Sequence, residues 1–530
     1  MRKCALLTYI LLVLLIPIQV IGAPPVFSFL EEDVEAFDTI LHQFDHKHGW
    51  DNDPIDHEGP IEMIQDLKLG RRSSHDAVWA LSPMWLDLGD QKEVLKHRRS
   101  LARSPVVWGV KKSKAERWGW TKTPPTTAEL FRKASSGELR GLMMASASHC
   151  TSGALAYLSM LYAAAGEPDM LKRRHLRDRS VQKTVRAWLK AISRSDQSSV
   201  WITDDLVHKY DQHDAMVNFQ AEVIRANREL EALGREPLVQ IVPREGTMLS
   251  QATLGFIPRE RGRMNRKKET FFLKLRRHLS SPEIQRTFRR LGWLSGVTPR
   301  LNPRVFRPEW GMQASLKYFP LPQLTVIEEA LELYQTKLRK PSLTLFVLDV
   351  SGSMRGDRLR DLKEAMHQVL DPQLTKRHLL QATPDDVTIV ITFSQGIRHK
   401  WVVRGNDPRE LRLLDQRVSS EVAGGGTHLF SALVEAYREI QEHPEYLRDH
   451  HPAIVLLSDG KPSRESRSWR DVKRIMKKAN QQGKVPIHPI LFGESDDQLM
   501  RQIAEESEGH LINAHDGRLT RAFRLLQGGH

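Results

Sequence analysis

The chain has 530 residues, of which 40% are hydrophobic and 27% charged, a composition typical of a globular rather than a disordered protein. Its length excludes a single domain and predicts two or three. The net charge of +14 makes acidic partners and anionic surfaces candidates, although the Lys and Arg residues are spread widely among Asp and Glu, as on ordinary solvated faces.

The first 23 residues have the pattern of a secretory signal. Basic Arg2 and Lys3 precede an apolar run, and small residues end the segment at Gly22 and Ala23. We expect cleavage after Ala23 and a periplasmic or extracellular location. The alternative is an uncleaved signal that anchors the protein in a membrane.

The only two cysteines are Cys4, inside the predicted signal, and Cys150. A mature chain with one thiol has no internal disulfide, so an exported protein of this kind depends on a large hydrophobic core. Cysteine-based zinc sites are excluded.

Residues 24–297 show the alternation of strands and helices that is typical of an α/β domain. The predicted strands are 26–30, 76–80, 106–110, 142–145, 238–242 and 254–257. The predicted helices are 31–48, 61–69, 126–136, 154–165, 181–192, 222–233, 268–279 and 281–291. Ser281 and Pro282 are a cap and a first-turn proline for the last of these helices. The proline-rich, irregular stretch 298–323 is predicted to be a linker.

Residues 324–530 are predicted to form a second α/β domain around a buried parallel strand at 343–348. Further strands are predicted at 387–393, 453–457 and 485–492. Helices are predicted at 358–370, 428–440, 470–482, 498–506 and 519–526.

Oxygen-bearing side chains follow the strand at 343–348 directly. Asp349 ends this strand, and the hydroxyls of Ser351 and Ser353 come on alternate residues after it. Thr427 follows three glycines, and Asp459 ends the strand at 453–457. Because the carboxyl ends of parallel strands share one edge of a sheet, these residues can converge on a hard divalent cation.

The order Asp349-Val-Ser-Gly-Ser353, then Thr427, then Ser458-Asp459-Gly460 resembles a von Willebrand factor A domain. The resemblance implies a doubly wound parallel sheet, similar to a Rossmann fold, with a metal-ion-dependent adhesion site. It implies that the hydroxyls of Ser351, Ser353 and Thr427 bind Mg²⁺ directly, with Mn²⁺ or Ca²⁺ as alternatives. Asp349 and Asp459 then act largely through waters, and an acidic residue of a protein partner completes the coordination.

Residues 24–297 resemble the two-lobed extracellular solute-binding proteins of the periplasmic type. Four stretches carry the resemblance: 26–44, 76–80, 104–111, which is similar to the crossing between lobes, and 271–292. It implies a cleft between lobes for a small solute or anion, and an association with membrane transport components. Phe29-Leu30-Glu31 replaces the hydroxyl pair that the family has after its first strand.

The predicted ligand residues of this cleft are hydroxyls and backbone N–H groups at the start of the helix near residue 154, where an anion can bind. They are Ser146, Ser148, Thr151, Ser152 and Gly153. The alternative is that Thr151 or Ser152 only caps the helix. Trp79, Ser82 and Tyr210 are candidates for the opposite wall, and Cys150 is expected to be a packed thiol.

The sequence supplies no general base aimed at a substrate, so we expect a non-enzymatic exported protein that joins a solute-binding-like module to a Mg²⁺-dependent protein-binding module. One alternative is an anionic-surface or nucleic-acid binder that uses the basic stretch 259–268, although export and the lack of interleaved aromatic residues argue against nucleic acid. Another is a chelatase-like component that partners a separate ATPase. The absence of a Gly-x-x-x-x-Gly-Lys-Ser/Thr run counts against an ATPase with an attached A domain. His428, His450 and His451 are expected to be surface or core residues rather than ligands.

Overall fold

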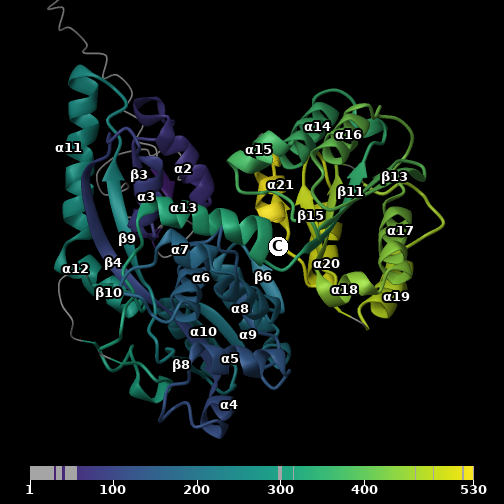
Figure 1. Cartoon of the computed structure of the whole chain (residues 1–530). Coiled ribbons are helices and arrows are strands. Elements are labelled where there is room, and N and C mark those ends of the chain that lie inside the picture. Colours follow the sequence, from purple (N-terminus) through teal and green to yellow (C-terminus); the bar gives the residue numbers. More distant parts are fainter. Residues whose placement is uncertain are drawn as a thin grey trace, which may run out of the picture.

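The computed structural model describes residues 29–31, 37, 39–41, 44, 56–295, 301–313, 315–459, 461–481, 483–515 and 518–528. They form two α/β units side by side, which we call the N-terminal and C-terminal units (Figure 1). The described strands make a ten-stranded sheet in the first unit and a six-stranded sheet in the second. The predicted signal segment 1–23 lies outside the described residues.

The N-terminal unit has two lobes that share one long strand. In the first lobe the order is β2 (Asp56–His57), β1 (Phe29–Glu31), β3 (Ala77–Ala80), β9 (Leu249–Phe256) and the first part of β4 (Lys96–Lys111), which also pairs with β10 (Leu294–Ser295). The helical elements are α2 (Pro60–Lys68), η1 (Gly70–Arg72), α3 (Pro83–Gly89), α11 (Gly262–Leu279) and α12 (Pro282–Arg290). The described residues between β1 and β2 are helical, and Phe37, Ile40, Leu41 and Phe44 are buried as their spacing predicts.

In the second lobe the order is β4, β7 (Ala215–Phe219), β5 (Met143–Ala145) and β6 (Arg194–Asp196), with β8 (Leu238–Ile241) on the other side of β4. Its helical elements are α4 (Lys112–Arg117), α5 (Thr127–Ser135), α6 (Thr151–Ala164), α7 (Arg173–Arg177), α8 (Arg179–Lys190), α9 (Ser199–His208), η2 (Tyr210–Gln212) and α10 (Gln220–Ala232). Strand β4 pairs with β9 as far as Pro105 and with β7 from Val106 onward, so the chain crosses between lobes within the predicted stretch 104–111.

Several of the elements that the sequence does not predict are short or have a mixed pattern. Strands β6 and β7 have three and five residues, too few to show a periodicity. Helix α9 carries two adjacent aspartates in its middle, which mask its apolar face. The apolar segment around Trp85 is the helix α3, which begins at a serine cap and a proline.

The C-terminal unit is a doubly wound sheet with the order β13 (Ile397–Arg404), β12 (Val387–Phe393), β11 (Ser342–Asp349), β14 (His451–Ser458), β15 (Ile487–Leu491) and β16 (Ile512–Asn513). Only β13, at one edge, is antiparallel among these described strands. Every residue of β11 is buried, because helices cover both faces of the sheet.

One face of this sheet packs on α17 (Leu429–Glu442), α18 (Glu445–Asp449), α19 (Trp469–Ala479) and α20 (Asp497–Ser507). The other face packs on α14 (Asp357–Leu370), α16 (Pro408–Ser419) and α21 (Leu519–Gly528). The short elements η5 (Gly352–Met354) and α15 (Pro372–Arg377) lie before and after α14.

The segment that joins the two units is packed rather than free. Val305, Phe306 and Trp310, with η3 (Pro308–Trp310), lie in the core on the outer face of the second lobe. The ring of Phe319 stacks on Tyr162 at 4.6 Å. The predicted linker is irregular in backbone, but its aromatic and apolar side chains anchor it to the second lobe.

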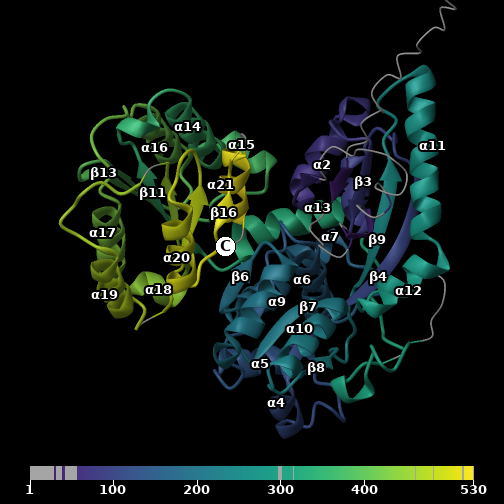
Figure 2. The same ribbon diagram turned by 180° about the vertical axis from the view of Figure 1, so that it is seen from behind.

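Helix α13 (Leu324–Leu333) and the π-helical turn η4 (Tyr334–Leu338) follow. Sequence analysis assigns these residues to the second domain, whereas their apolar side chains lie in the core of the N-terminal unit. In both views α13 runs between the two lobes (Figures 1 and 2). The apolar stripe of α13 correctly predicts that the helix is buried, but it does not indicate whether the helix packs in the N-terminal or the C-terminal unit.

Candidate metal centre and the region between the lobes

The end of strand β11 brings the first predicted metal ligands together. Asp349 Oδ1 accepts a hydrogen bond of 2.8 Å from the backbone N–H of Ser351, which bends the chain back over the strand end. The hydroxyl oxygens of Ser351 and Ser353 lie 3.0 Å apart. The hydroxyl of Ser353 donates to Asp459 Oδ1 at 2.7 Å, so a residue more than one hundred positions away joins the same cluster.

The glycine loop that carries Thr427 lies directly against these residues. The backbone N–H of Gly352 donates to Gly425 O at 2.9 Å, and that of Gly424 donates to Val350 O at the same distance. Gly425 has a φ of +86°, a conformation that favours glycine. Thr427 is buried, and its backbone N–H donates to Ser463 Oγ at 2.9 Å.

Both carboxylates of this cluster are fully buried. Burial raises the pKa of Asp349 above its usual range, and the neighbouring negative charge of Asp459 adds to the rise. Hydroxyl and carboxylate oxygens around buried negative charge are the donors that Mg²⁺ takes in proteins, so the residues present fit the predicted cation. Ser353 is exposed, which puts the cluster within reach of a partner.

Three neighbouring residues help to hold this arrangement, and the sequence alone does not single them out. Ser458 donates to Asp349 Oδ2 at 2.5 Å, and Ser463 receives the N–H of Thr427. Arg358, on α14, donates to Asp459 Oδ2 at 2.7 Å. Only the position of Ser458 beside Asp459 at the end of a strand gives a signal in the sequence.

The predicted anion-binding residues at the start of α6 are all fully buried, and protein groups contact their hydroxyls. The indole N–H of Trp85 donates to Thr151 Oγ1 at 2.6 Å. The hydroxyl of Ser148 donates to Gln335 Oε1 at 3.0 Å, and the hydroxyls of Ser146 and Ser148 lie 3.3 Å apart. Ser152 Oγ lies 3.3 Å from Cys150 Sγ, which is buried as expected of a packed thiol.

Gly153 of the same group contributes close packing. A Cβ at this position would lie 2.3 Å from Ala145 O and 2.5 Å from Ser146 O, so α6 approaches β5 at a distance that only glycine allows. The start of α6 is therefore held by β5 of its own lobe at Gly153, by α3 of the first lobe at Thr151 and, through Ser148, by η4.

Helix α13 and η4 lie where sequence analysis places a solute cleft. The hydroxyl of Tyr157 on α6 donates to Ala330 O at 3.0 Å, and the ring of Tyr157 lies 5.2 Å from that of Tyr334. Gln335, which contacts Ser148, belongs to η4. Ser148, one of the hydroxyls predicted to meet a solute, thus meets a segment of the same chain.

The three residues predicted for the opposite wall are divided between the two lobes. Trp79 is buried in the first lobe and stacks on Phe37 at 4.3 Å. Ser82 caps α3 by accepting from Met84 N. Tyr210 lies in the second lobe, under the ammonium group of Lys111. Each has a structural partner within its own lobe.

The basic stretch 259–268 is partly neutralised. The ammonium group of Lys268 is buried and lies 3.0 Å from both oxygens of Asp76 and 2.8 Å from Glu260. Arg259 lies 3.7 Å from Asp76. These pairs fix the start of α11 to β3, which leaves a smaller positive surface than the sequence indicates.

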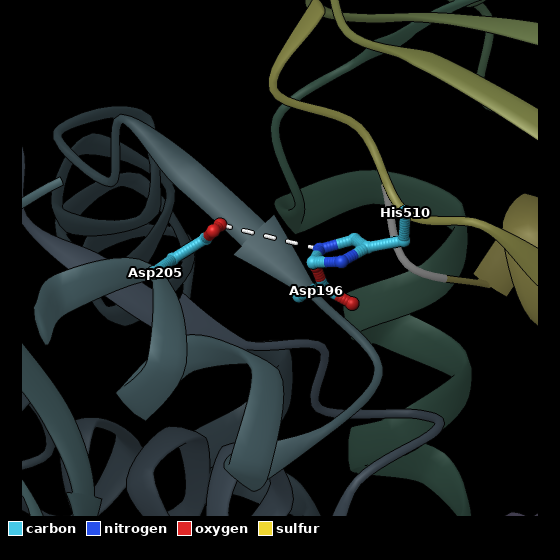
Figure 3. Close-up of side chains that lie close together, drawn as sticks. All are labelled: Asp196, Asp205 and His510. Carbon is cyan, nitrogen blue, oxygen red and sulfur yellow. Dashed lines mark hydrogen bonds and ion pairs between the residues drawn. The ribbon is translucent and has the colours of Figure 1, made fainter. Parts of the chain in front are cut away.

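A second group of metal-ligating residue types lies between the two units (Figure 3). The ligand atoms of Asp196, Asp205 and His510 all lie within 4.8 Å of one another. Arg194 and Lys209, however, each lie 2.7 Å from an oxygen of Asp205, so this carboxylate is already paired with two cations. The group is therefore an ion-paired contact between the second lobe and the C-terminal unit, rather than a metal centre.

The other histidines named from the sequence have structural contacts. His428 is the cap residue of α17, and its backbone N–H donates to Ser394 O at 2.7 Å. His450 contacts the carbonyls of Tyr446 and Asp385. The backbone N–H of His451, at the start of β14, donates to Pro341 O at 2.8 Å. None of the three belongs to the group of Asp196, Asp205 and His510.

Residues 345–524 match the sequence profile of the von Willebrand factor type A domain, which confirms the predicted family and fold of the C-terminal unit. The inter-alpha-trypsin inhibitor heavy chain H1 of Bos taurus is 25% identical over 194 residues, covering 35% of this chain and 20% of that protein. The heavy chain H2 of Homo sapiens is 27% identical over 175 residues, covering 32% of this chain and 17% of that protein. The chain thus spans about a fifth of the length of the curated relatives it matches.

Two solved structures show similarity to different parts of the chain. A von Willebrand factor type A protein from Catenulispora acidiphila has a TM-score of 0.29 and 21% identity, covering 36% of this chain and 43% of that chain. The ferric binding protein from Campylobacter jejuni has a TM-score of 0.41 and 14% identity, covering 58% of this chain and 98% of that chain. None of the helices in the described part of the chain has the length and apolarity that a membrane crossing needs.

Proposed function

We propose that this chain is an exported, non-enzymatic binding protein whose C-terminal unit docks an acidic side chain of a protein partner through a bound Mg²⁺ ion. The export part of the proposal rests on the signal pattern of residues 1–23. The docking part rests on the hydroxyl–carboxylate cluster at the end of β11. The proposed ligands are Asp349, Ser351, Ser353, Thr427 and Asp459.

The observation that carries the proposal is the hydrogen-bonded continuity of this cluster. Ser353 Oγ lies 2.7 Å from Asp459 Oδ1 and 3.0 Å from Ser351 Oγ, so oxygens from two strand ends face one small region. The hydroxyls leave the ion incompletely neutralised, and Mg²⁺ supplies an open position that favours a carboxylate. These residues would hold the cation, and the exposed position of Ser353 would leave it accessible to a partner.

The chemistry of the cluster favours binding over catalysis. The oxygens of Asp349 are both engaged, one by Ser351 N and the other by the hydroxyl of Ser458 at 2.5 Å. These two hydrogen bonds hold the buried carboxylate in place at the end of β11, which suits a residue that helps to hold a cation. The N-terminal unit then serves as a scaffold, since η4 contacts Ser148, one of the residues predicted to meet a solute, and α13 contacts Tyr157 of the helix α6 that follows it.

The test is a Mg²⁺ and Mn²⁺ titration of the full chain by calorimetry, with Asp349→Ala compared with Asp357→Ala. Asp357 is a matched control, because it lies at the exposed start of α14 and pairs with Arg360. We expect Asp349→Ala to abolish cation binding and Asp357→Ala to retain it. Equal binding by both variants, or equal capture of a partner in Mg²⁺ and in EDTA, would refute the proposal.

A further inference from the structure

Arg358 contacts one of the proposed metal ligands with its positive charge. Its NH1 group lies 2.7 Å from Asp459 Oδ2, while its NH2 group lies 3.4 Å from Glu494. Asp459 is fully buried, but about a third of the Arg358 side chain is exposed. The guanidinium therefore lies at the rim of the cluster, with one end on the buried carboxylate and the other toward solvent.

The backbone at Gly493 lies close to both Arg358 and Asp459. Gly493 has a φ of +64°, and a Cβ at this position would lie 3.0 Å from Asp459 Cβ and 3.1 Å from Arg358 Nε. Any side chain at position 493 would press on both partners of the ion pair. The pair thus occupies a narrow slot between α14 and the loop after β15, rather than a free surface position.

The ion pair between Arg358 and Asp459 reduces the net negative charge of the proposed cation site. Asp349 and Asp459 are the acidic members of the proposed ligand set, and Arg358 offsets one of their two charges. The Glu494 side chain is 88% exposed, so solvent screens its contribution. With the screened Glu494 left out, Asp349, Asp459 and Arg358 together supply one net negative charge to a divalent cation in this cluster, which is less than the charge of the cation.

We propose that Arg358 keeps the cation affinity of the site low, so that the carboxylate of an acidic partner supplies the missing negative charge and cation and partner are held together. This inference rests on the proposed function. Arg358 acts through Asp459 and is a positioning residue rather than a ligand. The partner class that it selects is an acidic peptide segment, because a neutral oxygen ligand leaves the charge deficit in place.

The experiment is a Mn²⁺ titration of the full chain without partner, followed by electron paramagnetic resonance of the free ion. It compares the unmodified protein with R358Q, R358K and R360Q. Arg360 is the matched control, because it lies on the same helix but pairs with the exposed residues Asp357 and Asp361. R358K tests the charge separately from the geometry.

We expect R358Q to bind Mn²⁺ about tenfold more tightly, the order of magnitude for removing one partly screened charge beside a cation. R358K and R360Q should stay within about twofold of the unmodified protein. If the unmodified chain binds Mn²⁺ and R358Q binds it no more tightly, the inference is wrong while the proposed function stands. If neither binds Mn²⁺, both are wrong.

Discussion

Acid should lower the free energy of unfolding of this protein through protonation of His149, which is buried where the two units meet. Its Nε2 atom lies 3.2 Å from His378 O, in the C-terminal unit, and its Nδ1 atom lies 2.8 Å from Ser148 Oγ. The ring also packs against Gly528, where a Cβ would lie 2.7 Å from its Cγ atom. Burial, with a smaller contribution from the positive charge of Arg339, lowers the pKa of His149 to about 4.

The sign of the effect follows from comparing the folded and unfolded chains. The imidazole of an unfolded chain has a pKa of about 6.5, so the unfolded state binds the proton more tightly than the folded state does. The contribution of His149 to stability is complete above pH 6.5 and is lost as the pH falls from 6.5 toward 4. At pH 5 the two pKa values correspond to a loss of about 2 kcal/mol.

Urea denaturation of the full chain at pH 7.5 and pH 5.0, followed by tryptophan fluorescence, measures this loss. Replacing His149 by Gln keeps hydrogen-bonding capacity but removes the titration, so the acid-induced loss should be about 2 kcal/mol smaller in His149→Gln than in the unmodified protein. His208→Gln is the control, because His208 is exposed on α9. An equal acid-induced loss in His149→Gln and in the unmodified protein would refute the reasoning.

Two further substitutions test the joint between the units and the packing of α6. Arg339 is buried and forms a two-armed ion pair with Asp386, with NH1–Oδ1 at 3.2 Å and NH2–Oδ2 at 2.5 Å. Arg339→Ala should therefore lower the unfolding free energy by about 3–5 kcal/mol. Arg186→Ala, which removes an exposed pair with Asp385, should change it by less than about 1 kcal/mol, and urea midpoints compare the two. Gly153→Ala should cost more than about 3 kcal/mol, because the new methyl group overlaps two carbonyl oxygens. Gly396→Ala, which meets open space, should be nearly neutral, and equal urea midpoints for the two glycine variants would contradict the packing argument.

The acidic and hydroxyl residues of the metal centre could be predicted because each follows a strand of one parallel sheet. Asp349 ends β11, and Asp459 directly follows β14, its parallel neighbour. The residues that position them left little trace in the sequence. Arg358 looks like any solvated residue on an amphipathic helix, and its partner lies 101 positions away.

The residues predicted to bind a solute, in contrast, could not be assigned a role from the sequence alone. Hydroxyls before an apolar helix are consistent both with an anion site and with buried helix packing, and only the tertiary structure distinguishes them. Here Trp85 and Gln335 hydrogen-bond to the hydroxyls of Thr151 and Ser148. The spacing of apolar residues in α13 indicates that one face of the helix is buried. Which core that face packs against depends on contacts with residues far away in the sequence, and the local pattern does not contain them.

The position of α13 also bears on how the protein folds as it is made. Synthesis runs from the amino to the carboxyl end, and the core of the N-terminal unit includes Val326, Ala330, Leu331 and Leu338. That core therefore stays open until the chain has been made past residue 338, only four residues before β11 begins at Ser342. Closing the first unit and starting the second sheet become consecutive events, so the first unit is expected to complete its folding only when the second is about to begin.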